Sequence, residues 1–500
     1  MARDPQAALV ALNRFGLGTR GAVSGDLAAA ASDPRGFVKA DLAKRDAALL
    51  AAPGLRDTPA LAQVLFDYQR EVKVEREAKA AAKVGGDSGA MAEPSASSAS
   101  DAAMRTDTMA AQQPGAMQNS PPAKSPPEQP NIVQQTYRAE ALARLQKACL
   151  AEVGLVERLV MFWSNHFCIS AGKGQPDRIW AGAFEREAIR PHVLGRFADM
   201  LKAVEQHPAM LFFLDNQQSI GPNSRAGQNR KRGLNENLAR EIMELHTLGV
   251  GGGYTQDDVT ALARIITGWT FAGREGRLGQ PGTFVFNVNA HEPGPQTLLR
   301  KVYPDTGVSQ GEAALADIAR HPSTAKFIAT KFTRHFVADD PPQALVARLA
   351  KMFAASDGDL KAMTVALLES DEAWQAPLSK LRTPYEFLVA SARLLSHVPE
   401  EPNRVLGALN LLGQPLWTPA GPNGFADTSA AWASPEGLKL RLDVASQIAS
   451  RIGDGVDARD LVDVMAGAAA SPETRQTVAR AESRQQALAL LLMSPEFQRR

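Results

Sequence analysis

The residue best placed to do chemistry is Glu241, an acidic side chain in the middle of an apolar helix face. On a helix that turns about 100° per residue, four leucines fall within about 60° of Glu241. They are Leu234, Leu238, Leu245 and Leu248. Because a buried carboxylate without a partner is costly, the sequence predicts a cation, a metal ion or a donor network beside Glu241. That arrangement is either a structural lock or a functional site, and the spacing leaves both open.

Further polar side chains follow Glu241 along the same segment. Asn237 and Glu244 fall on the edges of the leucine face, and Arg240 and His246 are close in sequence. Carboxylate, imidazole and guanidinium groups together can move protons and hold an anionic substrate. We therefore treat Glu241 as a candidate base or metal ligand and His246 as a candidate acid or base. Asn237 and Arg240 are candidate positioning groups.

Two more carboxylates, Glu157 and Glu187, also lie on apolar helix faces. Inward-facing glutamates on helices can build a dimetal site, but that site normally needs Glu-x-x-His on two helices, and this chain has no such motif. The alternative is pairing of buried glutamates with arginines. The available arginines are Arg190, Arg240 and Arg264.

Two histidines and a basic loop complete the candidate residues. His166, in Trp-Ser-Asn-His-Phe, is either a core histidine with satisfied hydrogen bonds or an acid–base group or ligand. His291 follows a predicted strand, on a loop, where functional residues concentrate. The loop over 217–233 is either a solvated basic surface or an attractor of an anionic substrate. The candidate substrate-binding residues are Arg230, Arg232, His291 and Trp269.

The elements that position these residues are predicted from periodicity and capping signals. Residues 234–248 form a helix, and the glycines at 249–253 end it. Thr255 then caps a second helix, and Asp257 and Asp258 complement its dipole. The central motif is therefore a helix, a tight turn and a second helix.

The rest of the chain also predicts helices. A long charged helix over 59–83 has Thr58 as its N-cap, and residues 155–168 are apolar on every side, as in a central buried helix. Residues 283–288 alternate like one arm of a hairpin. We expect an all-α, multi-helical globular body with one small β-hairpin and a disordered insertion. The parts are 1–83 (N-terminal helices), 84–130 (an Ala/Ser/Pro/Gln-rich disordered insertion), 131–370 (the central helical core) and 371–500 (the C-terminal helical part).

Composition excludes several classes of protein. The chain has 500 residues, 44% hydrophobic content and a net charge of +1, so nothing favours a nucleic acid or an anionic membrane as partner. Cys149 and Cys168 stand in apolar helical contexts and predict buried free thiols. No run of 18 apolar residues could span a membrane, and the first twenty residues lack the secretory-signal pattern.

Several motifs resemble, in order, those of the bacterial Domain of Unknown Function 1800 family. They are Leu-Asn-Arg-Phe-Gly at 12–16, Phe-Trp-Ser-Asn-His-Phe at 162–167, His-Pro-Ala-Met at 207–210, the Asn-Glu-Asn to His-Thr-Leu-Gly segment at 235–249, Gly-Gly-Tyr-Thr-Gln-Asp-Asp-Val at 252–259, Thr-Gly-Trp at 267–269 and Phe-Val-Ala-Asp-Asp-Pro-Pro at 336–342. The resemblance runs over nearly the whole chain except the insertion.

The resemblance implies no established reaction and no known cofactor. Many members look exported, and their genes often lie beside a second family, Domain of Unknown Function 1501, which resembles phosphatase and sulfatase folds. We therefore expect this chain to be cytoplasmic, or exported without its own signal as a passenger of such a partner.

Two classes of function follow. The first is a hydrolase-type enzyme whose pocket is formed by the 235–258 motif, the Trp163–His166 segment and the His291 loop. The second is a non-catalytic partner or maturation subunit of an exported phosphatase- or sulfatase-like protein, in which the polar motif shapes an interaction surface.

Overall fold

The computed structural model describes residues 4–21, 25–86, 131–228 and 233–500, and this part of the chain is mostly helical. It is 62% helix, with two small two-stranded sheets, so the predicted all-α class is confirmed. The insertion predicted at 84–130 lies outside the described residues, apart from 84–86, which end the helix α4. No helix in the described ranges combines the length and apolar character that crossing a membrane requires.

Eleven α-helices precede the β-strands in the described part of the chain. They are α1 (Pro5–Leu9), α2 (Asp26–Ser32), α3 (Pro34–Ala43), α4 (Thr58–Gly86), α5 (Ile132–Leu150), α6 (Leu155–His166), α7 (Gln175–Phe184), α8 (Phe197–Glu205), α9 (Pro208–Phe213), α10 (Asn237–Glu241) and α11 (Gln256–Ile265).

The remaining helices follow the strands. They are α12 (Val308–Ala319), α13 (Pro322–Phe336), α14 (Gln343–Ala355), α15 (Leu360–Glu369), α16 (Asp371–Gln375), α17 (Pro384–Leu394), α18 (Pro402–Leu411), α19 (Ser429–Trp432), α20 (Pro435–Ile452), α21 (Ala458–Met465), α22 (Pro472–Ala479), α23 (Arg484–Leu492) and α24 (Pro495–Gln498).

Capping side chains start several helices where the sequence places them. Thr255 and Asp258 form a capping box at the start of α11, and Thr383 forms one with Glu386 at α17. His207 and His321 each precede a proline, and the Nδ1 of each accepts the backbone N–H two residues on. These helix starts follow from local chemistry alone.

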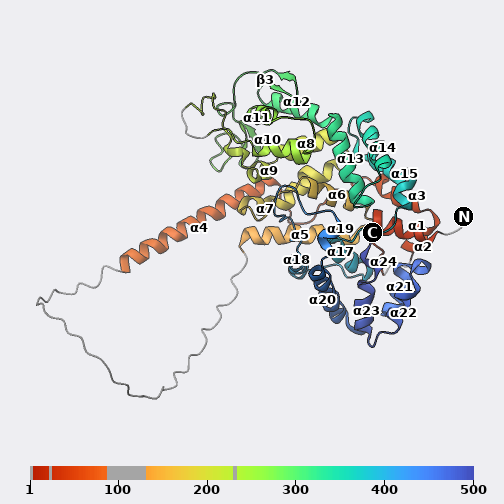
Figure 1. Ribbon diagram of the computed structural model, residues 1–500. Helices are drawn as coiled ribbons and strands as arrows, with labels where there is room; N and C mark the ends of the chain where they lie inside the picture. Colours follow the sequence, from red (N-terminus) through yellow and green to blue (C-terminus); the bar gives the residue numbers. More distant parts are fainter. Residues whose placement is uncertain (1–3, 22–24, 87–130, 229–232) are drawn as a thin grey trace, which may run out of the picture.

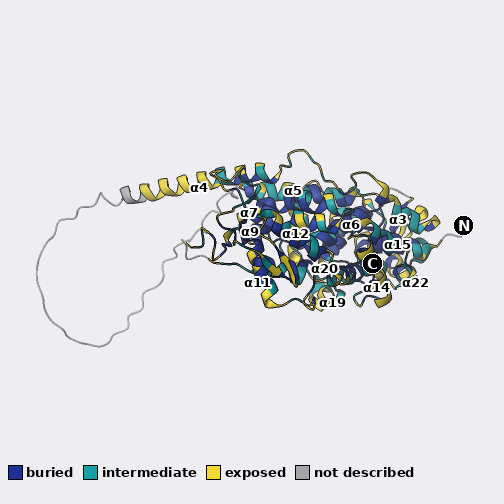
Figure 2. Cartoon of the chain, turned by 90° about the horizontal axis from the view of Figure 1, so that it is seen from above, coloured by how far each residue is buried: buried dark blue, intermediate teal, exposed yellow. Residues whose placement is uncertain are grey.

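Two apolar clusters hold the helices together. One is built around α6, α7, α8 and α13, and the other around α17, α20 and α23. α5, α6 and α7 cross the middle of the molecule in Figure 1, with the blue C-terminal helices on one side and the green helices α8 to α12 on the other. Figure 2 shows the buried residues concentrated inside the body, whereas α4 runs out of the body and becomes exposed.

The strands correct one prediction. β1 (Trp269–Phe271) pairs antiparallel with β2 (Phe284–Phe286), which confirms the arm predicted at 283–288, but β3 (Gln296–Leu298) and β4 (Lys301–Tyr303) form a second hairpin. The turn of that hairpin puts Leu299 and Arg300 at φ 49° and 64°. Such turns usually contain Asn or Gly, so the sequence carried no signal for this hairpin.

The helix predicted over 234–248 also needs correction. It begins at Asn237, and after Glu241 the backbone changes to a π-helical turn over Ile242–His246. Hydrogen bonds from residue i to i+5 make this turn wider than an α-helical one. Steps of 100° therefore misplace the side chains on its far side, and Leu234 lies outside the helix.

Candidate functional site

Glu241 differs from its predicted environment. It is half-buried, and the described residues give it no hydrogen bond and no ion pair. Burial raises the pKa of its carboxyl group, with opposing contributions from His246 and Arg240. The expectation that Glu241 is fully buried and paired is therefore wrong, because the helix starts later and widens after this residue.

Arg240 and Asn237, the sequence neighbours of Glu241, form hydrogen bonds with other residues. The Arg240 Nη2 donates to Glu236 Oε2 at 3.1 Å and to Gln256 Oε1 at 3.0 Å, and so connects α10 to α11. Asn237 is exposed, and its backbone N–H donates to the side chain of Asn235 at 2.9 Å. Both residues contribute hydrogen bonds to the motif, and the described structure gives neither side chain a hydrogen bond to Glu241.

The structure does bring His166 and His246 together, and adds a residue that the sequence did not single out, Glu205. The His166 Nε2 lies 3.0 Å from the backbone oxygen of His246, and the His246 Nδ1 lies 2.8 Å from Glu205 Oε1. All three side chains are buried, and within the described chain His166 Nδ1 and Glu205 Oε2 have no hydrogen-bond partner. Burial, Lys331 and His246 hold the pKa of His166 well below its usual value.

Two of the candidate substrate-binding residues, His291 and Trp269, lie in the described part of the chain, and both make structural contacts. His291 is buried and its Nδ1 donates to the Thr267 oxygen at 3.0 Å. Trp269 is buried in β1, and its backbone oxygen accepts from Asn216 Nδ2 at 3.0 Å. Arg230 and Arg232 lie outside the described residues.

Pairing with arginine explains one of the three predicted carboxylates. Glu157 binds the Arg190 guanidinium through both oxygens, at 2.8 and 3.0 Å. Glu187 instead accepts the backbone N–H of Thr58 at 2.9 Å and lies 3.4 Å from His207 Nε2. Among the described residues, no three histidines, cysteines or carboxylates gather as metal ligands do.

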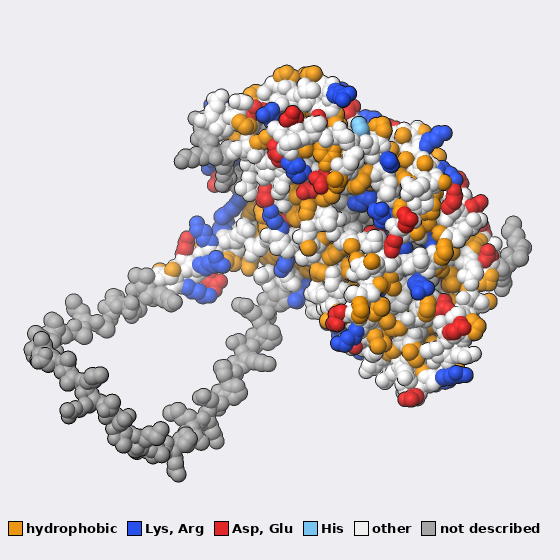
Figure 3. Space-filling view, in the orientation of Figure 1, with side chains coloured by type: hydrophobic (Ala, Val, Ile, Leu, Met, Phe, Trp, Pro, Cys, Tyr) orange, Lys and Arg blue, Asp and Glu red, His pale blue; other side chains and the backbone are white. Residues whose placement is uncertain are grey.

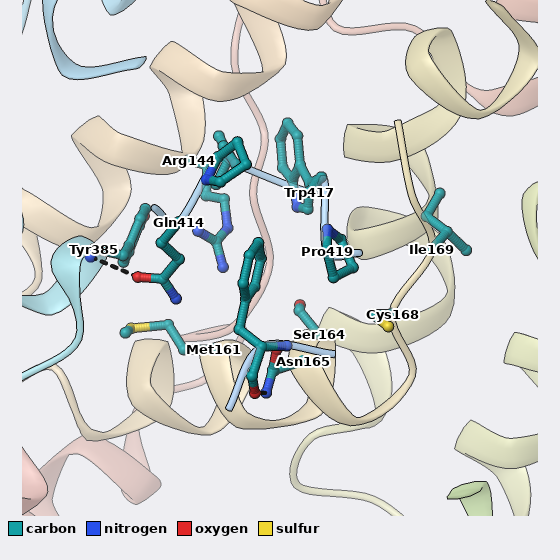
Figure 4. A pocket seen from close by; sticks show the side chains of 13 residues that line it. Arg144, Met161, Ser164, Asn165, Cys168, Ile169, Tyr385, Gln414, Trp417 and Pro419 are labelled. Carbon is teal, nitrogen blue, oxygen red and sulfur yellow. Dashed lines mark hydrogen bonds between the residues drawn. The ribbon is translucent and has the colours of Figure 1, made fainter. Parts of the chain in front are cut away.

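A pocket on the other side of α6 was not predicted. It encloses about 510 Å³, including space open to solvent, between α5, α6, α17 and the loop over 414–425 (Figure 4). Polar groups from four segments reach it. They belong to Arg144, Ser164, Asn165, Tyr385 and Gln414, and the apolar lining includes Met161, Leu416, Trp417, Pro419 and Phe425.

Arg144 is fixed at the base of this pocket. Its Nε donates to Glu185 Oε2 at 2.7 Å, and its guanidinium carbon lies 4.4 Å from the centre of the Tyr385 ring and 5.7 Å from that of Trp417. Burial acts to raise the pKa of Glu185, but Arg144 and Arg190 outweigh it and lower that pKa. The Nη1 and Nη2 of Arg144 have no hydrogen-bond acceptor in the described chain, and Figure 4 shows the guanidinium directed into the pocket.

The other polar groups of the pocket are neutral. Gln414 uses its Oε1 to accept the Tyr385 backbone N–H at 2.8 Å, and Ser164 donates to Glu185 at 3.0 Å. Burial raises the pKa of the Cys168 thiol to about 12, and the thiol points to the Pro422 oxygen at 3.3 Å. The pocket therefore offers hydrogen-bond donors and apolar walls, but no ionised nucleophile.

One sequence signal could have located this pocket. The segment 412–433 is irregular yet holds Trp417 and Phe425, and large aromatic side chains on a long loop indicate a packed or ligand-binding surface. Arg144 and Glu185 carried no such signal, because their pairing joins two distant helices.

Comparison with known proteins identifies a family. A family model described as "Protein of unknown function (DUF1800)" matches residues 10–499. Neither the curated proteins nor the solved structures gave a match.

Proposed function

Since the chain belongs to the DUF1800 family of proteins of unknown function, we propose its function from geometry: it binds a small organic carboxylate in the pocket of Figure 4. The observation that carries this proposal is the pair of Arg144 Nη groups, which face the pocket while Nε is held by Glu185. A guanidinium edge with two N–H donors matches the two oxygens of a carboxylate.

The surroundings of Arg144 support tight recognition. The contacts with Glu185, Tyr385 and Trp417 fix the guanidinium before a ligand arrives, so little side-chain entropy is lost on binding. Gln414 adds an amide donor, since its oxygen is already used by the Tyr385 backbone. The apolar walls suit a ligand whose other end is hydrocarbon or aromatic.

Calorimetric titration tests the proposal. Benzoate and hexanoate are the probes, and benzamide and hexanamide are their uncharged controls. We expect the acids to bind and the amides to bind at least tenfold more weakly. Arg144→Lys keeps the charge beside Glu185 but removes the two-pronged donor, and it should weaken acid binding by about tenfold.

Arg186→Lys is the matched control, because Arg186 pairs with Glu140 and does not line the pocket. It should leave the affinity unchanged. Equal binding of acids and amides, or equal affinity of the Arg144→Lys and Arg186→Lys variants, would contradict the proposal.

Hydrolysis is a second candidate, and the contact between Glu205 and His246 favours it. A carboxylate that orients an imidazole is a common arrangement for a general base. In this proposal His246 and His166 act on protons, Glu241 is a base or metal ligand, and Asn237 and Arg240 position the substrate. p-Nitrophenyl acetate, phosphate and sulfate are suitable probes, with and without added divalent metals. Hydrolysis above the buffer rate that His246→Gln abolishes is expected, and equal rates for both proteins would exclude it.

The partner hypothesis rests on the family resemblance. We propose a Domain of Unknown Function 1501 protein as the partner, with this chain either cytoplasmic or exported with it. Exposed leucines support a contact surface: Leu438 and Leu442 of α20 are 40% and 45% exposed. Figure 3 shows apolar side chains gathered over the region of α20 and α23. Co-expression and gel filtration test the complex, and separate elution of the two chains would contradict it.

A further inference from the structure

Four buried arginines meet where the N-terminal turn, α6 and the C-terminal segment come together. We call them the central arginine cluster, and its members are Arg14, Arg158, Arg382 and Arg500. Each is at most 1% exposed. The positive charge of Arg500 acts on each of the other three, so the four guanidinium groups share one region of the core.

One carboxylate neutralises part of this cluster. Glu386 lies between Arg158 and Arg500, binding Arg158 Nη1 through Oε1 and accepting from Arg500 Nε through Oε2 at 2.9 Å. Asp427 is 3.6 Å from Arg500 Nη2, but it also pairs with His335 and Lys380. Two carboxylates thus face four guanidinium groups and a lysine.

Backbone oxygens accept many of the remaining donors. Arg158 donates to the oxygens of Asn13 and Gly16, and Arg14 donates to three oxygens of residues 373–377. Arg382 is the exception, since the only hydrogen bond of its guanidinium to a described residue runs from Nη2 to Asn13 Oδ1 at 2.8 Å. Within the described ranges, Arg382 Nε and Nη1, together with Arg500 Nη2 and Arg14 Nε, have no acceptor.

Arg382 nevertheless carries its charge at neutral pH. Burial and the neighbouring Arg158 lower its pKa to about 9, which is still well above 7. Gly18 lies on one side of the guanidinium, and a Cβ built there would come within 3.4 Å of Nη1. Because Gly18 has no side chain, it does not cover this side of the Arg382 guanidinium.

We propose that the central arginine cluster holds a small inorganic anion, chloride under ordinary conditions, against Arg382. A buried guanidinium with unpaired N–H groups is costly, and an anion compensates both its charge and its donors. Guanidinium groups have no acceptor atoms, so a water molecule among them could not place its own hydrogens on them. The depth of the site favours a single-atom anion over sulfate or phosphate.

Bromide substitution tests this site on the whole protein. Crystals grown in sodium bromide should show an anomalous peak within hydrogen-bond distance of Arg382. In solution, the unfolding midpoint should rise with bromide or chloride compared with isethionate, a large anion, at equal ionic strength. Absence of the peak overturns the proposal, and so does a peak without a rise in the midpoint, which means an adventitious ion only.

Two variants locate the effect. Arg382→Met should abolish the dependence of the midpoint on halide. Arg393→Met is the matched control, since Arg393 is equally buried but its Nε and both Nη groups donate to backbone oxygens. It should lower the midpoint and keep the halide dependence. An unchanged halide dependence in Arg382→Met overturns the proposal, and the bromide peak decides the matter if that variant does not fold.

Discussion

The Nδ1 of His246 lies 2.8 Å from a carboxylate oxygen of Glu205, and both side chains are buried. The two residues come from a π-helical turn and from the end of α8, which are 41 positions apart in the chain. This contact is a buried polar connection between the central motif and the core, whereas Glu241 makes none to the described residues.

Removing the Glu205 carboxylate should destabilise the fold. Glu205→Ala leaves the His246 donor without an acceptor in the core, at a cost of about 2–4 kcal/mol. Glu205→Gln keeps an oxygen at the same position, so we expect a loss of less than about 1.5 kcal/mol. Urea denaturation of both variants measures the difference in the free energy of unfolding. Equal destabilisation by the two substitutions would show that the hydrogen bond to His246 does not stabilise the fold.

Glu241→Gln should change stability little, whereas Glu157→Gln should be costly. Glu241 is half-buried without a described partner, and burial raises its pKa, so a neutral amide is tolerated within about 0.5 kcal/mol. Glu157 is buried against Arg190, and neutralising it leaves that guanidinium poorly compensated, at about 3–5 kcal/mol. Thermal unfolding compares them, and a large loss for Glu241→Gln would restore the predicted polar lock.

Asp177→Asn should stabilise the protein at neutral pH. Asp177 is fully buried in the first turn of α7, its oxygens have no hydrogen-bond partner among the described residues, and burial raises its pKa to about 8. The folded state therefore holds a proton that the unfolded chain releases above about pH 4. Wild-type stability should fall as pH rises from 4 to 8.

The Asn variant lacks this titration, so its advantage should grow over the same pH range, reaching roughly 1–4 kcal/mol at pH 7. Denaturation at pH 4, 6 and 8 measures it. An advantage that does not change with pH would contradict the assignment to Asp177.

Trp417→Phe should lower stability by about 1 kcal/mol, because phenylalanine cannot donate to Glu185 as the indole does at 3.2 Å. Trp432→Phe is the control, since its indole hydrogen bond to the Ala426 oxygen is exposed. Urea unfolding should distinguish the two, and equal stability of both variants would argue against a role for the partly buried indole contact.

The sequence located elements better than it located contacts. The helix start at Thr255 follows from side chains that act on their own neighbours, and such local chemistry is readable without a fold. The N-cap predicted at Thr58 is wrong by one residue. α4 begins at Thr58, Asp57 Oδ1 accepts the Ala60 N–H, and the Thr58 hydroxyl lies 3.1 Å from His207 Nε2. The environment of Glu241 was misjudged because a π-helical turn leaves no clear trace in periodicity. These errors are local, and each has a backbone cause.

Contacts between helices that are distant in the sequence could not be predicted from the residues alone. Arg144 and Glu185 are 41 positions apart, and Tyr385 and Trp417 reach the same place from the last third of the chain. The spacing of these residues gives no sign that they meet, because their contact depends on how α5, α7 and α17 pack. The sequence identifies His166 and His246 as candidate residues. It does not predict their contact, because that contact depends on how α6 packs against the π-helical turn.

α6 carries Ser164 and Asn165 on the pocket side and His166 on the other, in consecutive positions of one rigid helix. A ligand that pushes against the first two residues therefore moves the imidazole of the third. The ring of His166 is a built-in reporter, and its NMR signals should register occupancy of a pocket that it never touches.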